Sequence, residues 1–399
     1  MQQLLGGPRA GLDPDDVAAA FLLTVGTKLR HGVDVLNSSD VKLDVDLKFE
    51  AGSVAWAFRP PDDVTGVTNE VALVRRTASL TVVGLTSLFL EGYRYRPWTE
   101  ILSPAGIWVR VNRGVFVATS PAVEDDGAVV RRRLTLAEKT HRLKRPLLEP
   151  LTVPAATNPV TYVTGSMTAL FGETGFDIPA TTVTTTGVKT WAADGTTWLQ
   201  VYNQLLEVCA YDNLTVNEDT GRYRSVALAD LAGRGPELIY GPGERKLVVP
   251  GSLEPLLPEI YNVARFVARK GPTLPTEGNG YRTKYNQSTG PSSIDRLGGD
   301  QRVVVVQVDA ESQTQLDALA SAQAQQYFAG GGWRFTGKVG INPLHGDRDV
   351  AGLVHPRLGV AADDTGWLVT GWSSPMPTEI KGPDDGLMPV VFEKKVVLT

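Results

Sequence analysis

The longest helical pattern in the chain lies near its C-terminal end. Between Asp309 and Phe328, apolar residues recur every three or four positions, namely Leu316, Leu319, Ala320, Ala324, Tyr327 and Phe328. This spacing gathers them on one face of a helix and leaves the other face polar. Asp309 is the expected N-cap, and Gly330–Gly332 is the expected stop. The pattern predicts an amphipathic helix over residues 309–329.

Directly after this helix the hydrophobic period changes to two. Trp333, Phe335, Val339 and Ile341 alternate with polar or small residues, which predicts a half-buried antiparallel strand that ends at the turn Pro343–Asp347. The strictest alternation in the chain spans residues 41–49, where every second residue is apolar and the residues between are charged. It predicts a strand with one face in water.

Shorter patterns predict the remaining elements. Alternating segments bounded by turn residues indicate strands at residues 70–75, 78–83, 106–111, 113–119, 129–136, 261–269, 303–308, 366–372 and 388–398. Glu124–Gly127 joins two of these strands as a hairpin. Helices are predicted at Val17–Val25 and Thr197–Tyr211, and the second of them leads into a hairpin that turns at Glu218–Gly221.

The order of these elements predicts an α+β fold, mainly β, with two small antiparallel β-barrel domains and an intervening α+β domain. Proline-rich connectors at residues 147–159 and 250–258 suggest the boundaries. The expected units are an N-terminal lead and short helix (1–30), a first β-barrel hub domain (31–148), the α+β domain (149–258) and a second β-barrel hub domain (259–399). The last unit includes the helix 309–329 and a long loop, 271–299, which is either disordered or a contact arm and is expected to order only on assembly.

Composition and charge exclude several function classes. The 399-residue chain has a formal net charge of −5, which argues against a nucleic-acid binder that relies on neutralising phosphates. The basic runs Arg131–Arg133 and His141–Arg145 are interpreted as a solvated strand face and a linker or subunit contact. The longest apolar run near the start is too short to span a membrane and follows acidic residues, so neither a membrane-spanning segment nor a signal peptide is expected.

The sequence contains no recognisable catalytic or metal-binding motif. The single cysteine, Cys209, excludes an intramolecular disulfide and is expected to be a buried structural thiol. His345, Asp347 and His355 supply too few ligands for a metal centre, and a turn or interface role is favoured. We therefore expect no catalytic residue, no cofactor site and no metal site.

Two features keep a carbohydrate-active protein open as an alternative. Paired carboxylates occur at Asp363–Asp364 and Asp384–Asp385, although aspartates in such turns usually close the backbone. Tryptophans that would suit a sugar-binding groove stand at positions 98, 333, 367 and 372, although at strand spacing they more often belong to a core or an interface.

Several short motifs, in this order, resemble the baseplate hub or tail-tip (tail-associated minor tail) protein family of tailed bacteriophages, which also occurs in contractile injection systems. The points of similarity are Val115–Thr119 before a hairpin, Trp198–Tyr211 followed by Asp219–Gly221, Tyr261–Val263, the helix Ala318–Phe328, and Pro343–Asp347 followed by Gly366–Val369. The resemblance covers residues 30–399.

The resemblance implies a non-enzymatic structural protein of the virion, located at the tail tip or baseplate after assembly in the host cytoplasm. Such a protein forms a homotrimer whose alternating barrels adapt a sixfold tail tube to a threefold tip. Its implied partners are a distal tail protein or tail tube ring, the tape-measure protein, a tip fibre or receptor-binding protein, and DNA that passes without specific binding. The alternatives are a glycan-degrading tail enzyme and a receptor-binding adhesin module.

Overall fold

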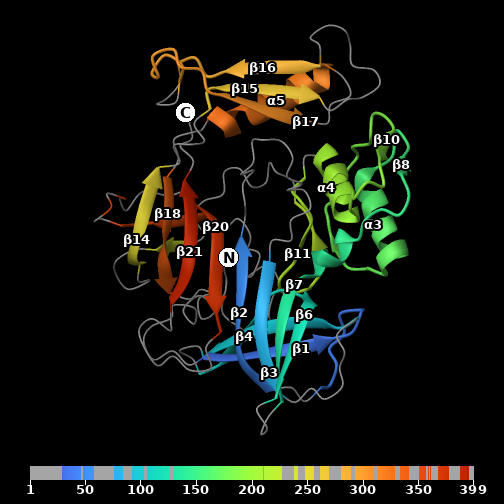
Figure 1. Ribbon diagram of the computed structural model, residues 1–399, viewed down its shortest axis with the longest axis vertical. Helices are drawn as coiled ribbons and strands as arrows, with labels where there is room; N and C mark the ends of the chain where they lie inside the picture. The colour runs from blue at the N-terminus through green and yellow to red at the C-terminus, as the bar shows by residue number, and fades with distance from the viewer. Residues whose placement is uncertain are drawn as a thin grey trace.

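The structure of the chain is a computed structural model. It describes residues 29–45, 48–57, 76–83, 92–102, 106–125, 130–209, 211–226, 238–240, 248–255, 261–268, 280–288, 293–308, 313–328, 333–340, 350–355, 358, 360, 367–376 and 387–394. These residues form one large sheet, a helical unit beside it and a separate small sheet covered by a helix (Figure 1).

The large sheet has thirteen strands in the described part of the chain. Its neighbours run in the order β1 (Leu29–Leu36), β4 (Arg94–Leu102), β6 (Phe116–Asp125), β7 (Val130–Glu138), β3 (Arg76–Val83), β2 (Lys48–Ala57), β20 (Trp367–Pro375), β21 (Leu387–Lys394), β18 (Trp333–Gly340) and β14 (Val248–Pro255). Three strands lie off this path: β5 (Trp108–Asn112) pairs with β4, and β19 (Val350–Leu353) pairs with β20 and β13 (Leu238–Tyr240).

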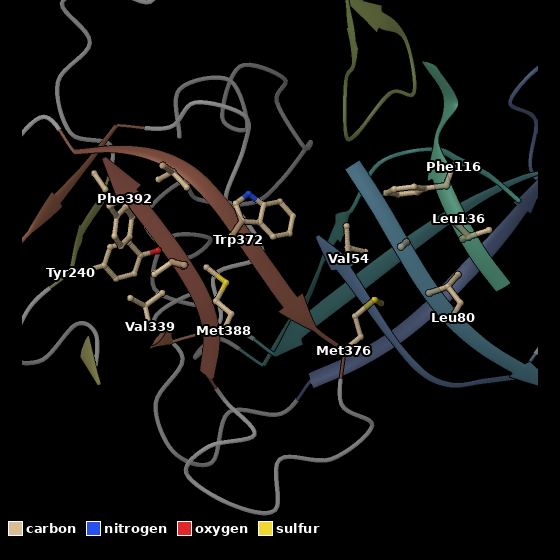
Figure 2. Close-up of a cluster of buried hydrophobic side chains, with 14 of the residues drawn as sticks. Val54, Leu80, Phe116, Leu136, Tyr240, Val339, Trp372, Met376, Met388 and Phe392 are labelled. Carbon is tan, nitrogen blue, oxygen red and sulfur yellow. The ribbon is translucent and has the colours of Figure 1, made fainter. Parts of the chain in front are cut away.

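Strands from the two ends of the chain meet within this sheet. β2 and β20 pair antiparallel, from Ser53 opposite Pro375 to Ala57 opposite Gly371. One hydrophobic cluster continues across this seam. Figure 2 shows its side chains running from Tyr240 and Phe392, past Met376, to Leu80. The N-terminal and C-terminal strands therefore share a single core.

The helical unit contains two helices and short strands. α3 (Pro159–Phe171) begins at Asn158, whose side chain accepts the N–H of Thr161, and α4 (Trp198–Val208) begins at Thr197 with a capping box completed by Gln200. The remaining elements are the 3₁₀ helix η2 (Lys139–Lys144), the pair β8 (Leu151–Val153) and β10 (Lys189–Trp191), and the small sheet of β9 (Phe176–Asp177), β11 (Thr215–Val216) and β12 (Tyr223–Arg224).

The third unit is a three-stranded sheet with one helix. β15 (Val263–Ala268) pairs antiparallel with β16 (Tyr281–Tyr285) and parallel with β17 (Val303–Val308). α5 (Gln313–Phe328) buries Leu316, Ala320, Ala324 and Phe328 against this sheet, and these residues follow one another at intervals of four. No described helix has the length and apolar character needed to cross a membrane.

The α+β, mainly β class predicted from the sequence is confirmed. The helices predicted at 197–211 and 309–329 are present as α4 and α5, and most predicted strands occur within a few residues of their expected positions. Among the described strands the pairings follow an open path from β1 to β14 and do not close into a barrel. The predicted domain boundaries stay a prediction.

The prediction of one strand over residues 41–49 is wrong. Residues 41–45 follow a turn in which Asn37 Oδ1 accepts the N–H groups of Ser39 and Val41, and the strand β2 begins only at Lys48. The side-chain hydrogen bonds of Asn37 compete with extended pairing at this position. Val41 is consequently 58% exposed, although the alternation predicted that it would face a core.

Two segments predicted as irregular contain strands. β14 occupies most of the predicted connector 250–258; it lies at the end of the sheet path, and its register shifts between Val249 and Ser252, where Pro250 is tolerated. β16 lies inside the predicted long loop 271–299 and pairs with β15 within one chain. The expectation that the loop orders only on assembly stays a prediction.

The elements that were not predicted include β1, β4 and α3. Several other expectations fall outside the described residues: the helix at 17–25, the strand at 70–75, the cap at Asp309, the stop at Gly330–Gly332 and the turn Pro343–Asp347.

Candidate functional site

The residues considered for catalysis do not assemble into a site. His345, Asp347 and the paired carboxylates at 363–364 and 384–385 lie outside the described residues. His355 packs beside the Phe335 ring, with centroids 5.9 Å apart. In the part of the chain that the structure describes, no three His, Cys, Asp or Glu side chains are arranged to hold a metal ion.

The other reactive candidates have structural surroundings. Cys209 is half-buried at the C-cap of α4, less buried than predicted, and desolvation raises the pKa of its thiol, which disfavours the thiolate. Burial and the nearby Lys144 lower the pKa of His141. Trp367 and Trp372 are buried in the sheet core, as a core role predicts. The Trp98 indole lies against Gly32 on the neighbouring strand, where an added Cβ would meet it at 2.2 Å.

The most distinctive polar feature is an ionic cluster buried between the large sheet and the helical unit. Glu173 accepts hydrogen bonds from Arg94 Nη2 at 2.7 Å and from Arg142 Nη1 at 2.6 Å. The Nζ of Lys139 lies 3.2 Å from the other oxygen of Glu173. Asp40 accepts from Arg94 Nη1 and Lys139 Nζ, both at 2.6 Å. Three cations thus share two carboxylates, and Arg94, Lys139 and Glu173 are each exposed by 2% or less.

Local backbone structure brings the two carboxylates to this cluster. Asp40 adopts a left-handed conformation (φ 61°) in the turn after β1, a region that Asp tolerates better than most residues. Gly172, also left-handed (φ 69°), ends α3 as its C-cap and places Glu173 directly after the helix. Asp40 therefore comes from the large sheet and Glu173 from the helical unit. Both contact Arg94 on β4 and Lys139 on η2.

A second set of buried charges extends the junction toward β11. Arg76 on β3 lies 2.6 Å from Glu218 through Nη2 and donates from Nη1 to the carbonyl of Val216 at 3.1 Å. Glu138 Oε1 lies 3.7 Å from Arg76 and accepts the N–H of Val216 at 3.3 Å. Arg76 and Glu138 of the large sheet thus bind the backbone carbonyl and N–H of Val216, a residue of β11 in the helical unit.

Further apolar and polar contacts join the large sheet to the helical unit. Leu36 at the end of β1 and Val115 directly before β6 belong to the hydrophobic cluster that also holds residues of α3 and α4. Lys139 donates to the carbonyl of Gly221 at 3.0 Å, and its ammonium lies 4.6 Å from the centre of the Tyr223 ring. Burial, with the neighbouring Glu173 charge, raises the pKa of Tyr223 well above its ordinary value. We call this set of contacts the ionic junction; its chemistry fixes two units together.

Sequence patterns did not reveal the ionic junction. Arg94 and Lys139 occur in alternating or basic segments, where a charged residue is normally solvated, and Glu173 follows a helix that was not predicted. The resemblance named Val115–Thr119 and Asp219–Gly221 as separate points of similarity, and the structure brings these two segments into contact. Gly221 (φ 72°) packs against Val115, whose Cγ2 would lie 2.7 Å from a Cβ added at position 221.

Comparison with solved structures finds the same fold in phage tail proteins. The tail protein from Neisseria meningitidis MC58 is 10% identical, with a TM-score of 0.58 over 92% of this chain and 98% of that chain. The 43 kDa tail protein of prophage MuSo2 from Shewanella oneidensis is 9% identical, with a TM-score of 0.56 over 93% and 100% of the two chains. A chain of the Francisella PdpA-VgrG complex is 7% identical, with a TM-score of 0.51 over 96% of this chain and 61% of that chain.

These matches confirm, at the level of the fold, the resemblance to phage tail proteins predicted from the sequence. No protein-family model and no curated protein sequence matches the chain.

Proposed function

We propose that the chain is a structural hub of a phage tail tip or baseplate, and that three copies form a ring adapting a sixfold tail tube to a threefold tip. The observation that carries the proposal is the fold match to two tail proteins, which spans at least 92% of this chain and 98% of theirs. A match over both lengths aligns the large sheet, the helical unit and the small sheet together.

The proposed ring has defined neighbours. On one side it binds a distal tail protein or tail tube ring, and on the other a tip fibre or receptor-binding protein. Its channel surrounds the tape-measure protein and later passes DNA. The net charge of −5 supports passage without tight binding, because few phosphates would be neutralised. The proposed location is the virion tail tip, after assembly in the host cytoplasm.

The ionic junction supports a mechanical role. A subunit that transmits force along a tail has to keep its parts in fixed orientation. Buried charges that are fully paired oppose relative sliding of two units, because any displacement leaves a charge in a low-dielectric environment. The role is structural rather than enzymatic in this proposal.

Multi-angle light scattering on the purified chain at several concentrations tests the proposal. We expect a mass three times the 42.9 kDa of one chain, and threefold rings in negative-stain images. A mass equal to one chain at every concentration would count against the homotrimer.

A glycan panel and a cell-binding assay separate the alternatives. We expect the isolated chain to release no sugar and to bind no host cells. Hydrolysis that disappears on replacement of one carboxylate would favour a glycan-degrading enzyme instead. Direct binding to cells would favour an adhesin module.

A further inference from the structure

The small sheet of β15, β16 and β17 has apolar side chains on the face that points away from α5. α5 packs against the face that bears Ala264, Phe266 and Val304. The residues between these, which the strand register places side by side, form the opposite face. We call it the outer face; its members are Val263, Arg265 and Val267 on β15, Tyr281, Thr283 and Tyr285 on β16, and Val303, Val305 and Gln307 on β17.

The outer face is apolar where it meets solvent. Tyr285, Val303 and Val305 are 57%, 49% and 52% exposed. Tyr285 and Val303 lie on either side of the buried Val263, and Val305 lies beside Arg265. The exposed apolar groups therefore form one patch, whereas single scattered ones would need no explanation. A sheet face that remains in solvent normally carries polar residues.

The pairing of β17 also favours a second covering layer. β17 runs parallel to β15 and contains four valines in succession, at positions 303–306. Parallel strands occur almost only in sheets that are covered on both faces, and for that reason they read as continuous apolar runs. α5 supplies one covering layer. The sequence of β17 therefore fits a sheet whose outer face is covered in an assembly.

A single positive charge stands in the middle of the outer face. Arg265 is exposed and lies over the Tyr281 ring, 4.3 Å from its centre. Its neighbours on the adjoining strands are Thr283 and Val305, and the outer face contains no Asp, Glu or Lys. Protein interfaces are enriched in Tyr and Arg and depleted in Lys, Asp and Glu. The composition is therefore that of a protein interface whose partner brings a carboxylate for Arg265.

This charge decides how a second copy of the chain can meet the outer face. If two outer faces met about a twofold axis, each Arg265 would be buried against a surface without an acid and near a like charge. A different surface of the second copy can supply the carboxylate, because the chain has 44 acidic and 39 basic side chains. Such a contact is heterologous, and heterologous contacts between identical copies form a ring when their rotation closes.

We propose that the outer face binds a second copy of this chain, through a surface of that copy that covers the valines and places a carboxylate beside Arg265. Each copy then uses its outer face on one neighbour and its carboxylate-bearing surface on the other, so that three copies close into a ring. This inference rests on the proposed hub function, because it assigns a contact surface to the proposed homotrimer.

Light scattering of full-length variants over a range of concentrations tests the contact. Val305→Lys adds a charge to the outer face, and Arg265→Glu reverses the charge already there. Each should raise the dissociation constant of the trimer at least about tenfold, because interface arginines and desolvated charges commonly contribute that much. Val188→Lys, at a valine that is 60% exposed in the helical unit, is the matched control and should remain trimeric. All three positions are exposed, so the variants should fold, which circular dichroism checks.

Hydroxyl-radical labelling adds a readout of the covered surface itself. Tyr285 should react several-fold less in the wild-type trimer than in monomeric Val305→Lys, because the neighbouring copy shields it. A wild type that is monomeric at every concentration would overturn the proposed trimer together with this contact. A trimer that both outer-face variants leave intact, or in which Tyr285 stays reactive, would overturn the contact alone and leave the hub proposal standing. A wild-type dimer that Val305→Lys dissociates would overturn the heterologous arrangement.

Discussion

Glu173 is the residue on which most of the ionic junction depends, because three cations converge on its carboxylate. Glu173→Gln keeps the shape of the side chain and removes its charge, which leaves Arg94 and Lys139 with Asp40 alone and takes away the carboxylate that Arg142 contacts. Breaking a buried pair in this way typically costs about 3–5 kcal/mol. We expect a loss of that size in the free energy of unfolding, measured by urea denaturation.

Glu149→Gln is the matched control for this change. Glu149 is exposed, so the substitution should alter stability by less than about 0.5 kcal/mol. A loss below about 1 kcal/mol in Glu173→Gln would show that the junction contributes little to folding.

His31 gives a pH dependence of defined sign. Burial lowers its pKa from 6.5 to about 4 in the folded chain. The unfolded chain therefore takes up a proton at higher pH than the folded chain does, and stability falls as the pH drops from about 6.5 toward 4. We expect this residue to account for about 2–3 kcal/mol of the stability lost between pH 7 and pH 4.5.

Urea unfolding of the wild type and His31→Gln, in phosphate-free buffer at both pH values, measures this term. Because other groups titrate in the same range, the informative quantity is the difference between the two proteins. The variant should lose less stability than the wild type on acidification. Equal losses would mean that His31 titrates normally.

At the scale of single elements, α4 depends on its N-terminal capping box. Thr197 accepts the N–H of Gln200, and the Gln200 side chain accepts the N–H of Thr197. Thr197→Ala removes one of these bonds and should lower the free energy of unfolding by about 1 kcal/mol. Thr197→Ser retains the hydroxyl and should stay close to the wild type. If both variants were equally destabilised, packing of the threonine methyl would be the cause.

Elements whose signals are local were predictable from the sequence. α4 combines a cap at Thr197 with an apolar face, and β17 is a short valine-rich run between polar segments. β4 was missed because Pro97 argues against an interior strand. In the structure Pro97 lies opposite Val33 on β1, and its carbonyl accepts a hydrogen bond from Arg113 N at 2.8 Å. α3 was missed because its many threonines and valines favour strands.

A local turn and a set of distant contacts account for two features that the sequence did not predict. Residues 41–49 show the strictest alternation in the chain, but the turn at Asn37 prevents one continuous strand there. The ionic junction depends on distant contacts: Arg94 and Glu173 lie 79 positions apart, and only the folded arrangement of sheet and helix makes their charges partners. In the sequence alone, a charged residue that will be buried and paired looks the same as one that will be solvated.

At the scale of the whole molecule, the small sheet with α5 has a core of its own. Among the described residues, the buried members of its cluster come from β15, β17 and α5, whereas the large sheet buries Leu80 in a different cluster. We expect Leu316→Ala to speed amide hydrogen exchange within β15–β17 and α5 and to leave β3 unchanged, because local unfolding follows separate cores.

Leu80→Ala is the matched change in the other core. It should speed exchange in β2, β3 and β7 and leave α5 unchanged, as measured by mass spectrometry on peptic peptides. If either variant speeded exchange throughout the molecule, the two cores would unfold as one cooperative unit.

The pairing of β2 with β20 also governs how the chain folds while it is being made. Ala57 and Trp367 are separated by about 310 positions, which a ribosome adds in about 15–60 s. Until then one edge of β2 has no β20 to pair with, and the core side chain Val54 lacks its C-terminal neighbours. A nascent chain with an unpaired edge is open to pairing with other chains. Synthesis of this protein therefore includes a long interval in which the unpaired edge of β2 can bind a chaperone or another chain before β20 is made.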